Sequence, residues 1–166
     1  MGLQASATHT RQDPCRQVSP VNGSHTRYVR LTALPSAVPW ARRVLRHMLH
    51  EWQVDSMTDP AALLVSELVT NAVEASAGDA GRAHGQLPMI GLAIRLTAAS
   101  LVLEVWDASP LRPVPQKADT AGDRGRGLLL IDALADSWGH RAADGGKIVW
   151  CAVAIQSVSA STSAAS

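Results

Sequence analysis

The stretch LLVSELVTNAV at residues 63–73 decides the fold, because it combines the apolar stripe of a helix with two polar residues beside it. Glu67 and Asn71 are four residues apart, so both side chains point to the same place from one helix. A carboxylate can accept a proton from a nucleophile, and a carboxamide oxygen is a suitable ligand for Mg²⁺. The stretch therefore predicts a polar site at the rim of a core, although an ordinary amphipathic helix would show the same pattern.

The composition is that of one globular domain. The chain has 166 residues, of which 46% are hydrophobic and 17% charged, which is enough for a sizeable core. The net charge of +1 gives no electrostatic footprint for nucleic acid. No apolar run approaches the roughly 18 residues that cross a bilayer, and the first twenty residues lack the apolar core of a signal peptide. Cys15 and Cys151 form neither a disulfide framework nor a metal-binding spacing, so we expect a reduced, cytoplasmic protein without a membrane or nucleic-acid partner.

The chain divides into one domain and two tails. Residues 1–24 are polar and lack periodicity, and residues 157–166 are a run rich in Ser and Ala, so we expect both to be disordered. Between them, the domain at residues 25–156 has no internal repeat.

The hydrophobic patterns within the domain predict an alternation of strands and helices. Strands are expected at 27–33, 89–97, 101–106, 137–141 and 147–155, and helices at 36–52, 58–76 and 127–135. Ser36 is a plausible N-cap of the first helix, and residues 108–123 read as one long loop, a feature that is often functional. Hairpin strands with helices between them favour an α+β two-layer sandwich, with a mixed, mostly antiparallel sheet covered on one face by about three helices.

A second candidate site residue is Asp107, which ends the strand at 101–106. A carboxylate in this place can accept a hydrogen bond from an exocyclic amine such as that of adenine. A strand-end aspartate that bonds its own backbone would look the same in the sequence.

A third feature is the segment GDRGRGL at residues 122–128, directly before the last helix. Glycines allow the backbone to approach a ligand closely, and the N-terminus of a helix suits phosphate. Arg124 and Arg126 would add positive charge. The segment follows a Pro-rich loop rather than a strand and lacks the Lys-Ser/Thr pair of a P-loop, so both common phosphate motifs are excluded, while a flexible loop is not.

In order and spacing, these pieces together resemble the nucleotide-binding module of the GHKL ATPases, the superfamily of gyrase, Hsp90-type chaperones, histidine kinases and MutL. The resemblance runs from Tyr28 to Ile155 and is strongest to the small anti-sigma factor serine/threonine kinases. ELVTNA at residues 67–72 fits the N box, Asp107 fits the first glycine box, GRGL at residues 125–128 fits the second, and residues 146–150 fit the last core strand. The fold implied is the Bergerat ATP-binding fold.

The resemblance implies a role for each residue of the N box and the first glycine box. Asn71 would coordinate the Mg²⁺ that bridges the triphosphate of ATP. Glu67 would be the general base, acting on a water or on a partner's serine hydroxyl. Asp107 would hold the adenine amino group.

The resemblance also assigns the second glycine box. Gly125, Gly127 and Leu128 would present their backbone to the phosphates, with Arg124 and Arg126 beside them. Residues 111–124 would be the lid over ATP.

The chain departs from the family pattern at two places. Ala108-Ser109-Pro110 replaces the glycines that usually follow the first-box aspartate, as in the anti-sigma-like subgroup. Ile148 stands where the family usually has a threonine whose hydroxyl helps the aspartate to bind adenine, so we expect one adenine contact to be missing.

The function implied is that of an ATP-binding anti-sigma factor with serine/threonine kinase activity. It would sequester a sigma factor and phosphorylate an anti-anti-sigma partner of the STAS type, and the resemblance implies a homodimer to which the first helix, residues 38–52, contributes. The alternative is a non-catalytic nucleotide-binding or docking module that regulates transcription through protein–protein contacts, for which Ile148 is the motive. A sensor histidine kinase is disfavoured, because no phospho-acceptor histidine precedes the module.

Overall fold

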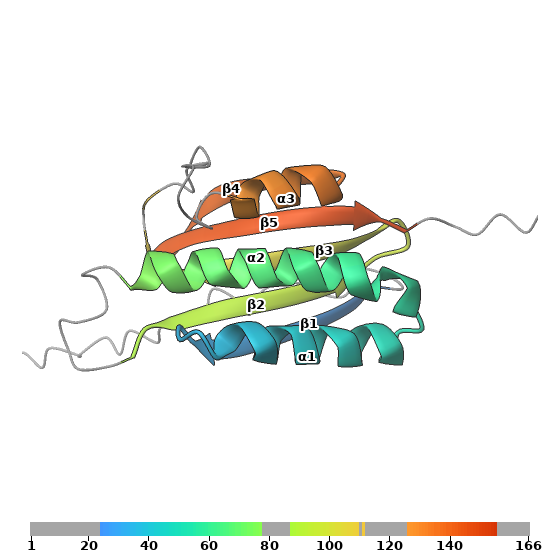
Figure 1. Cartoon of the computed structure of the whole chain (residues 1–166), viewed down its shortest axis with the longest axis horizontal. Helices are drawn as coiled ribbons and strands as arrows, with labels where there is room; N and C mark the ends of the chain where they lie inside the picture. The colour runs from blue at the N-terminus through green and yellow to red at the C-terminus, as the bar shows by residue number, and fades with distance from the viewer. Residues whose placement is uncertain (1–23, 78–86, 110, 112–125, 156–166) are drawn as a thin grey trace, which may run out of the picture.

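The computed structural model of the chain describes residues 24–77, 87–109, 111 and 126–155. The elements follow in the order β1 (His25–Thr32), α1 (Ala37–Glu51), the 3-10 helix η1 (Asp55–Met57), α2 (Thr58–Ser76), β2 (Met89–Leu96), β3 (Ser100–Asp107), α3 (Arg126–Leu134), β4 (Ser137–Ala143) and β5 (Gly146–Ala154) (Figure 1). The predicted order of strands and helices is confirmed, with small shifts at the ends. The expected disorder of the tails concerns residues outside the described ranges, apart from Ser24.

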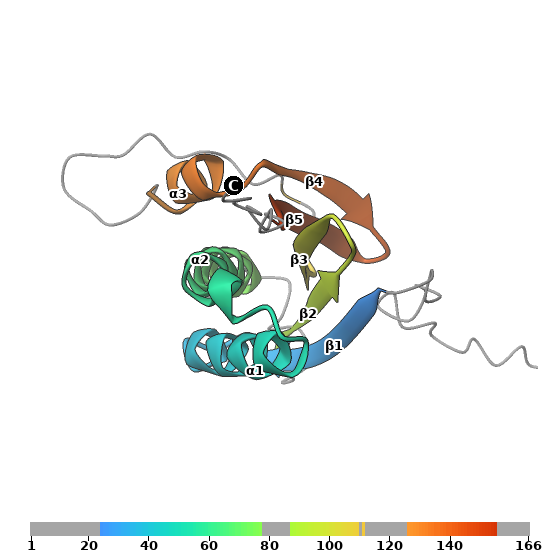
Figure 2. The same ribbon diagram turned by 90° about the vertical axis from the view of Figure 1, so that its right-hand side faces the viewer.

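The strands form one five-stranded sheet in the order β1-β2-β3-β5-β4. All the strand pairs are antiparallel, so the sheet is more uniform than the mixed sheet expected. Figure 2 shows the three α-helices together on one face of this sheet. The architecture is therefore the predicted α+β two-layer sandwich.

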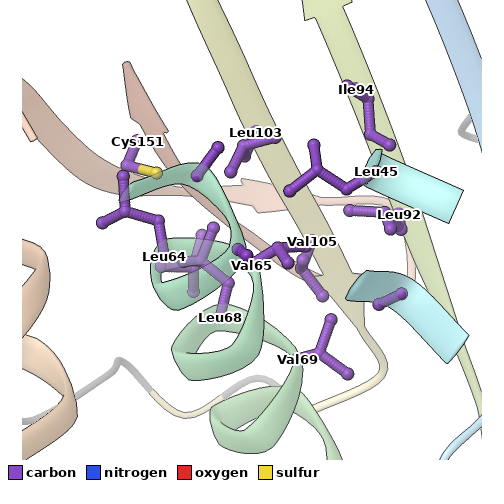
Figure 3. Packing of buried hydrophobic residues seen from close by; sticks show 14 of the residues in the cluster. Leu45, Leu64, Val65, Leu68, Val69, Leu92, Ile94, Leu103, Val105 and Cys151 are labelled. Carbon is purple, nitrogen blue, oxygen red and sulfur yellow. The ribbon is translucent and has the colours of Figure 1, made fainter. Parts of the chain in front are cut away.

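Helix α2 is the central element of the helical layer. Its side chains Leu64, Val65, Leu68 and Val69 are at most 1% exposed, and they pack against β3 and between the flanking helices (Figure 3). The apolar stripe predicted from the sequence is therefore the one that faces the core.

The two faces of the sheet differ because side chains alternate along each strand. In β3, Leu101, Leu103, Val105 and Asp107 are buried beneath the helices, while the residues between them are only partly buried. The β3–β5 register aligns Leu103 with Cys151, and burial raises the pKa of that thiol to about 12. Cys151 thus acts as a small apolar residue of the core.

The opposite face of the sheet carries a partly buried charge bridge. The Glu104 carboxylate, with its side chain 12% exposed, pairs with Arg95 at 2.7 Å and with Arg141 at 2.8 Å. Ile148 lies on this face, since it is aligned with Trp106 of β3 and Arg141 of β4. This face thus joins strands by charge, whereas the helical face joins them by apolar packing.

Two local expectations need comment. Ser36 is not a side-chain N-cap: it has φ −65° and ψ −15°, its side chain makes no capping hydrogen bond, and the Ala37 N–H donates to the Leu34 carbonyl at 2.8 Å instead. The turn that includes Ser36 already has helical geometry, so its hydroxyl is not placed as a cap. Within the described ranges, none of the helices combines the length and apolarity needed to cross a bilayer.

Candidate functional site

The first part of the site lies where α2 meets α3. Glu67 and Asn71 lie beside the buried stripe of α2 and are partly buried themselves, at the side of the helix that packs against α3. Helix α3 begins at Arg126, so its second residue is Gly127. The expected polar site at the rim of the core therefore has a second helix as its wall.

Gly127 lies directly against the two polar side chains of α2. A Cβ atom placed on Gly127 would be 2.5 Å from Oε2 of Glu67 and 3.6 Å from Oδ1 of Asn71. Any side chain at this position would collide with the carboxylate, so only glycine allows this approach. The structure thus brings together Glu67, Asn71 and Gly127, which come from two separate motifs of the sequence.

Asn71 carries an unused hydrogen-bonding group. Its Nδ2 atom is buried and has no hydrogen-bond partner in the part of the chain that the structure describes. A buried, unpaired amide costs free energy, and a ligand that completed its hydrogen bond would recover that cost. The amide oxygen of Asn71 lies on the side of Gly127, and amide oxygens are suitable ligands for Mg²⁺. The residues present therefore fit a magnesium–triphosphate group, with Asn71 as the ligand.

Glu67 has the electrostatics of a base that holds its proton more tightly than usual. Burial raises its pKa above the ordinary value, and the negative charge of Glu74, two turns further along α2, raises it again. A more basic carboxylate is a better proton acceptor as long as it stays ionised at the working pH. This fits the general-base role that was predicted for Glu67.

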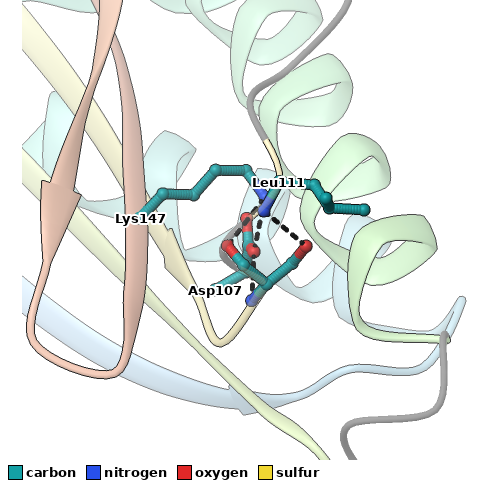
Figure 4. Close-up of polar contacts among 4 residues, drawn as sticks. Asp107, Leu111 and Lys147 are labelled. Atoms are coloured by element: carbon teal, nitrogen blue, oxygen red, sulfur yellow. Dashed lines mark hydrogen bonds and ion pairs between the residues drawn. The ribbon is translucent and has the colours of Figure 1, made fainter.

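The second part of the site is the carboxylate at the end of β3. Asp107 is 1% exposed, and its Oδ1 atom accepts hydrogen bonds from Lys147 Nζ at 2.7 Å and from the Ser109 N–H at 2.9 Å (Figure 4). Lys147 also donates to the Ser109 carbonyl at 3.3 Å. Burial raises the pKa of Asp107, while the hydrogen bonds and charge of Lys147 and the Ser109 N–H oppose that rise. The sequence alone left open that Asp107 only bonds the neighbouring backbone. The hydrogen bond from the Ser109 N–H is such a contact, and Asp107 makes it together with the ion pair to Lys147.

A glycine also makes this second part possible. Gly146 begins β5, and a Cβ atom there would overlap the carbonyl oxygen of Asp107 and lie 2.8 Å from Cα of Ala108. The preceding residue, Gly145, forms the hairpin turn with φ +68°, a left-handed conformation that favours glycine. The DGG turn therefore lets the end of β3 lie close against β5.

The expectation for Ile148 was wrong. Strand alternation places Lys147, and not Ile148, opposite Asp107 on the helical face. Ile148 belongs to the opposite face of the sheet, so its apolar side chain takes no hydrogen bond away from Asp107. The residue that sequence reasoning missed is Lys147, and the signal was present: a lysine at an inward-facing position of a strand that is otherwise apolar.

The structure leaves several predicted residues without a test. Arg124, Gly125 and nearly all of the predicted lid lie outside the described residues, as does the side chain of Arg126. Leu128 is 8% exposed and packs in the core, which leaves its backbone role a prediction. Among the described residues, no hydrogen bond or ion pair joins Asp107 to Glu67 or Asn71, so the site consists of two clusters, one between the helices α2 and α3 and one at the end of β3.

Comparison with known proteins agrees with this geometry. The family model described as "Histidine kinase-like ATPase domain" matches residues 31–153. A search of the curated proteins finds no match to the chain. The matched range includes both clusters of the site and the whole of β2, β3 and β4, together with β5 except its last residue, but only the last two residues of β1.

The contact at Gly127 gives a first prediction. Replacing Gly127 by Ala should displace the Glu67 carboxylate, because the atom in the way is the end of a flexible side chain rather than backbone. Alanine is the stronger helix former by up to about 1 kcal/mol, so the melting temperature should hold or rise. ATP-dependent turnover should fall by about 100-fold, the usual scale for a misplaced catalytic group.

Calorimetric melting and a turnover assay on the same preparations test this. Gly139→Ala is the control, since its Cβ would press on the Trp150 ring on the other face of the sheet, 3.1 Å away. It should cost stability and leave turnover per folded molecule intact. Unchanged turnover in Gly127→Ala would contradict the proposed closeness of α3 to Glu67.

The pKa of Glu67 gives a second prediction. Glu74→Gln removes a negative charge that raises this pKa, so the pKa should fall toward the ordinary value. Because the base must be ionised to work, the acidic limb of the pH–rate profile should move to lower pH, while the plateau stays the same. Steady-state rates across the acidic range measure the shift, with Glu51→Gln on α1 as the control. An acidic limb that does not move would show that Glu74 does not affect the pKa of Glu67.

Proposed function

The chain belongs to the histidine kinase-like ATPase family, and we propose that within it the protein is an anti-sigma factor that acts as a serine/threonine kinase. Its substrate would be an anti-anti-sigma protein of the STAS type, and its second partner a sigma factor. The observation that carries the kinase part is the closeness of Gly127 to both Glu67 and Asn71. It places a candidate base, a candidate metal ligand and the start of a helix around one point.

These residues would divide the work of phosphoryl transfer. Asn71 would hold Mg²⁺, which neutralises charge on the triphosphate when it is bound. The first backbone N–H groups of a helix have no partner within it, so those of α3 would suit the phosphates. Asp107 would accept a hydrogen bond from the amino group of adenine. The two clusters would thus bind the two ends of ATP.

Glu67 would supply the base. Its carboxylate would accept the proton of the partner's serine hydroxyl as that oxygen attacks the γ-phosphorus. The bond from phosphorus to the bridging oxygen breaks, and ADP leaves with the electron pair. The raised pKa of Glu67 supports this role, because it brings the carboxylate closer to the pKa at which a base works best near neutral pH.

The choice of the small anti-sigma kinases within the family rests on sequence. Ala108-Ser109-Pro110 after Asp107 and the strand that begins with Gly146-Lys147 follow the pattern of that subgroup. The docking-only alternative was motivated by Ile148, and the strand register removes that motive. It remains as an outcome of the experiment below.

A phosphotransfer assay tests the proposal and gives the third prediction. The full chain is incubated with radiolabelled ATP, Mg²⁺ and a panel of STAS proteins from the same organism. The parent should label the serine of one of them. Glu67→Gln should lose about 10²- to 10⁴-fold in rate while it still binds ATP, since only the base is removed. Asn71→Ala should lose ATP–Mg²⁺ binding in calorimetry.

The outcomes separate the two functions. ATP binding without transfer to any STAS protein would sink the kinase half. If Glu67→Gln still silences its sigma factor in a transcription assay, regulation proceeds through docking alone. If the parent protein binds no ATP, the proposed kinase function is contradicted.

The proposal includes a homodimer that uses α1. Trp40 on this helix is 59% exposed, a large apolar group left on the surface, whereas Trp52 packs against the core and stacks on His25 with ring centroids 5.5 Å apart. Exposed tryptophans are frequent anchors of interfaces. Trp40 is therefore the residue of α1 that is free to contact a second copy.

The fourth prediction follows from this surface. Trp40→Glu should convert a dimer to a monomer in sedimentation experiments without lowering the melting temperature, because the side chain is not part of the core. Leu129→Glu on α3 is the matched control, with 58% of that residue exposed, and should leave the dimer intact. A parent protein that sediments as a monomer would contradict the dimer. Dimers formed by Trp40→Glu would exclude this face.

A further inference from the structure

Lys147 is a buried cation near the start of β5, on the face of the sheet that the helices cover. Its side chain is 7% exposed, and its neighbours on the same face of β5 are the apolar Val149 and Cys151. Burying an ammonium group is costly unless it is paired and hydrogen-bonded. Its partners are Asp107 Oδ1 at 2.7 Å and the Ser109 carbonyl at 3.3 Å.

The two hydrogen bonds that Asp107 accepts fall on the same oxygen. Both Lys147 Nζ and the Ser109 N–H donate to Oδ1, and no described residue donates to Oδ2. A carboxylate can accept at both oxygens, so the described residues fix one oxygen of this group and supply no donor to the other. The ion pair thus holds the carboxylate in one orientation, with an acceptor that the described residues leave unused.

We propose that Lys147 is a positioning residue for recognition of the nucleobase: it holds Asp107 by Oδ1 so that Oδ2 accepts a hydrogen bond from the 6-amino group of a purine. This inference rests on the proposed binding of ATP at Asp107. It goes beyond that function by naming the residue that sets base specificity. The ligand class is a 6-aminopurine nucleotide.

The charge of Lys147 has a second effect on the same oxygen. Burial raises the pKa of Asp107, and Lys147 is the charged group that acts against the rise among the described residues packed around it. If the ammonium group were lost, only the Ser109 N–H would oppose burial, and the pKa would move further up. A carboxyl protonated on its free oxygen presents a donor to the amine, which is itself a donor. Lys147 therefore favours the ionised form of Asp107, which is the form that can only accept a hydrogen bond.

The experiment compares two ligands that differ only at the base. The full chain is titrated with ATP–Mg²⁺ and with purine riboside triphosphate–Mg²⁺, which lacks the 6-amino group, between about pH 6 and 9. The ratio of their dissociation constants is the readout. The triphosphates are identical, so titration of phosphate, Mg²⁺ binding and the charge of Glu67 cancel in the ratio.

The fifth prediction concerns this ratio. The parent should prefer ATP by about tenfold or more at every pH, the value of a hydrogen bond to a charged acceptor. In Lys147→Met the preference should shrink toward equality at low pH and recover as the pH rises and Asp107 ionises. Lys147→Gln keeps a donor but not the charge, so it should show the same pH dependence from a folded, hydrogen-bonded site. Ile148→Thr, next to it on the other face, should behave as the parent does.

Each outcome decides the matter. A ratio in Lys147→Met or Lys147→Gln that equals the parent's at every pH overturns the inference. The inference is also overturned if the parent protein binds both ligands equally well, or if its preference for ATP falls at low pH. These two results come from the parent protein and do not depend on the folding of any variant. A parent that binds both ligands equally leaves the proposed nucleotide site standing, whereas a parent that binds neither overturns both proposals.

Discussion

The structure depends on helix α2 meeting two surfaces at once. Leu64 and Leu68 are buried against the sheet, and the face beside them brings Glu67 and Asn71 to α3. With 3.6 residues per turn, the position of the apolar stripe fixes the direction of the polar pair. Core packing therefore sets the geometry of the candidate site, and a rotation of α2 that spoiled one would spoil the other.

The second constraint is the register of β3 and β5. Because side chains alternate with a period of two, a slip of one residue would bring Ile148 to Asp107 and turn Lys147 to the open face. The ion pair between Glu104 of β3 and Arg141 of β4 reaches across β5 on that open face, so it opposes such a slip, which would carry Arg141 out of place. The apolar pairs on one face and the charge bridge on the other thus fix the same register.

These constraints explain what the sequence could and could not predict. The strands, the helices and the shared face of Glu67 and Asn71 follow from periodicity, which is a local property, whereas a common site for that pair and Gly127 was implied by the family resemblance. The partner of Asp107 depends on which residue of a distant strand stands opposite it, and a family pattern located that strand only to within one residue. The Ser36 cap failed for a related reason, because the turn before α1 is set by contacts of Leu34 and Ala37 rather than by the serine.

The candidate site also has a thermodynamic cost. Burial disfavours the ionised forms of Glu67 and Asp107, and Nδ2 of Asn71 has no hydrogen-bond partner among the described residues. A core selected for stability alone would replace such groups with apolar ones, as the surrounding leucines and valines show. The chain offsets the cost where it can, through Lys147, and leaves it uncompensated at Asn71. An uncompensated polar group has a physical reason when a ligand completes its hydrogen bonds, and the proposed nucleotide with its metal would do so at Asn71.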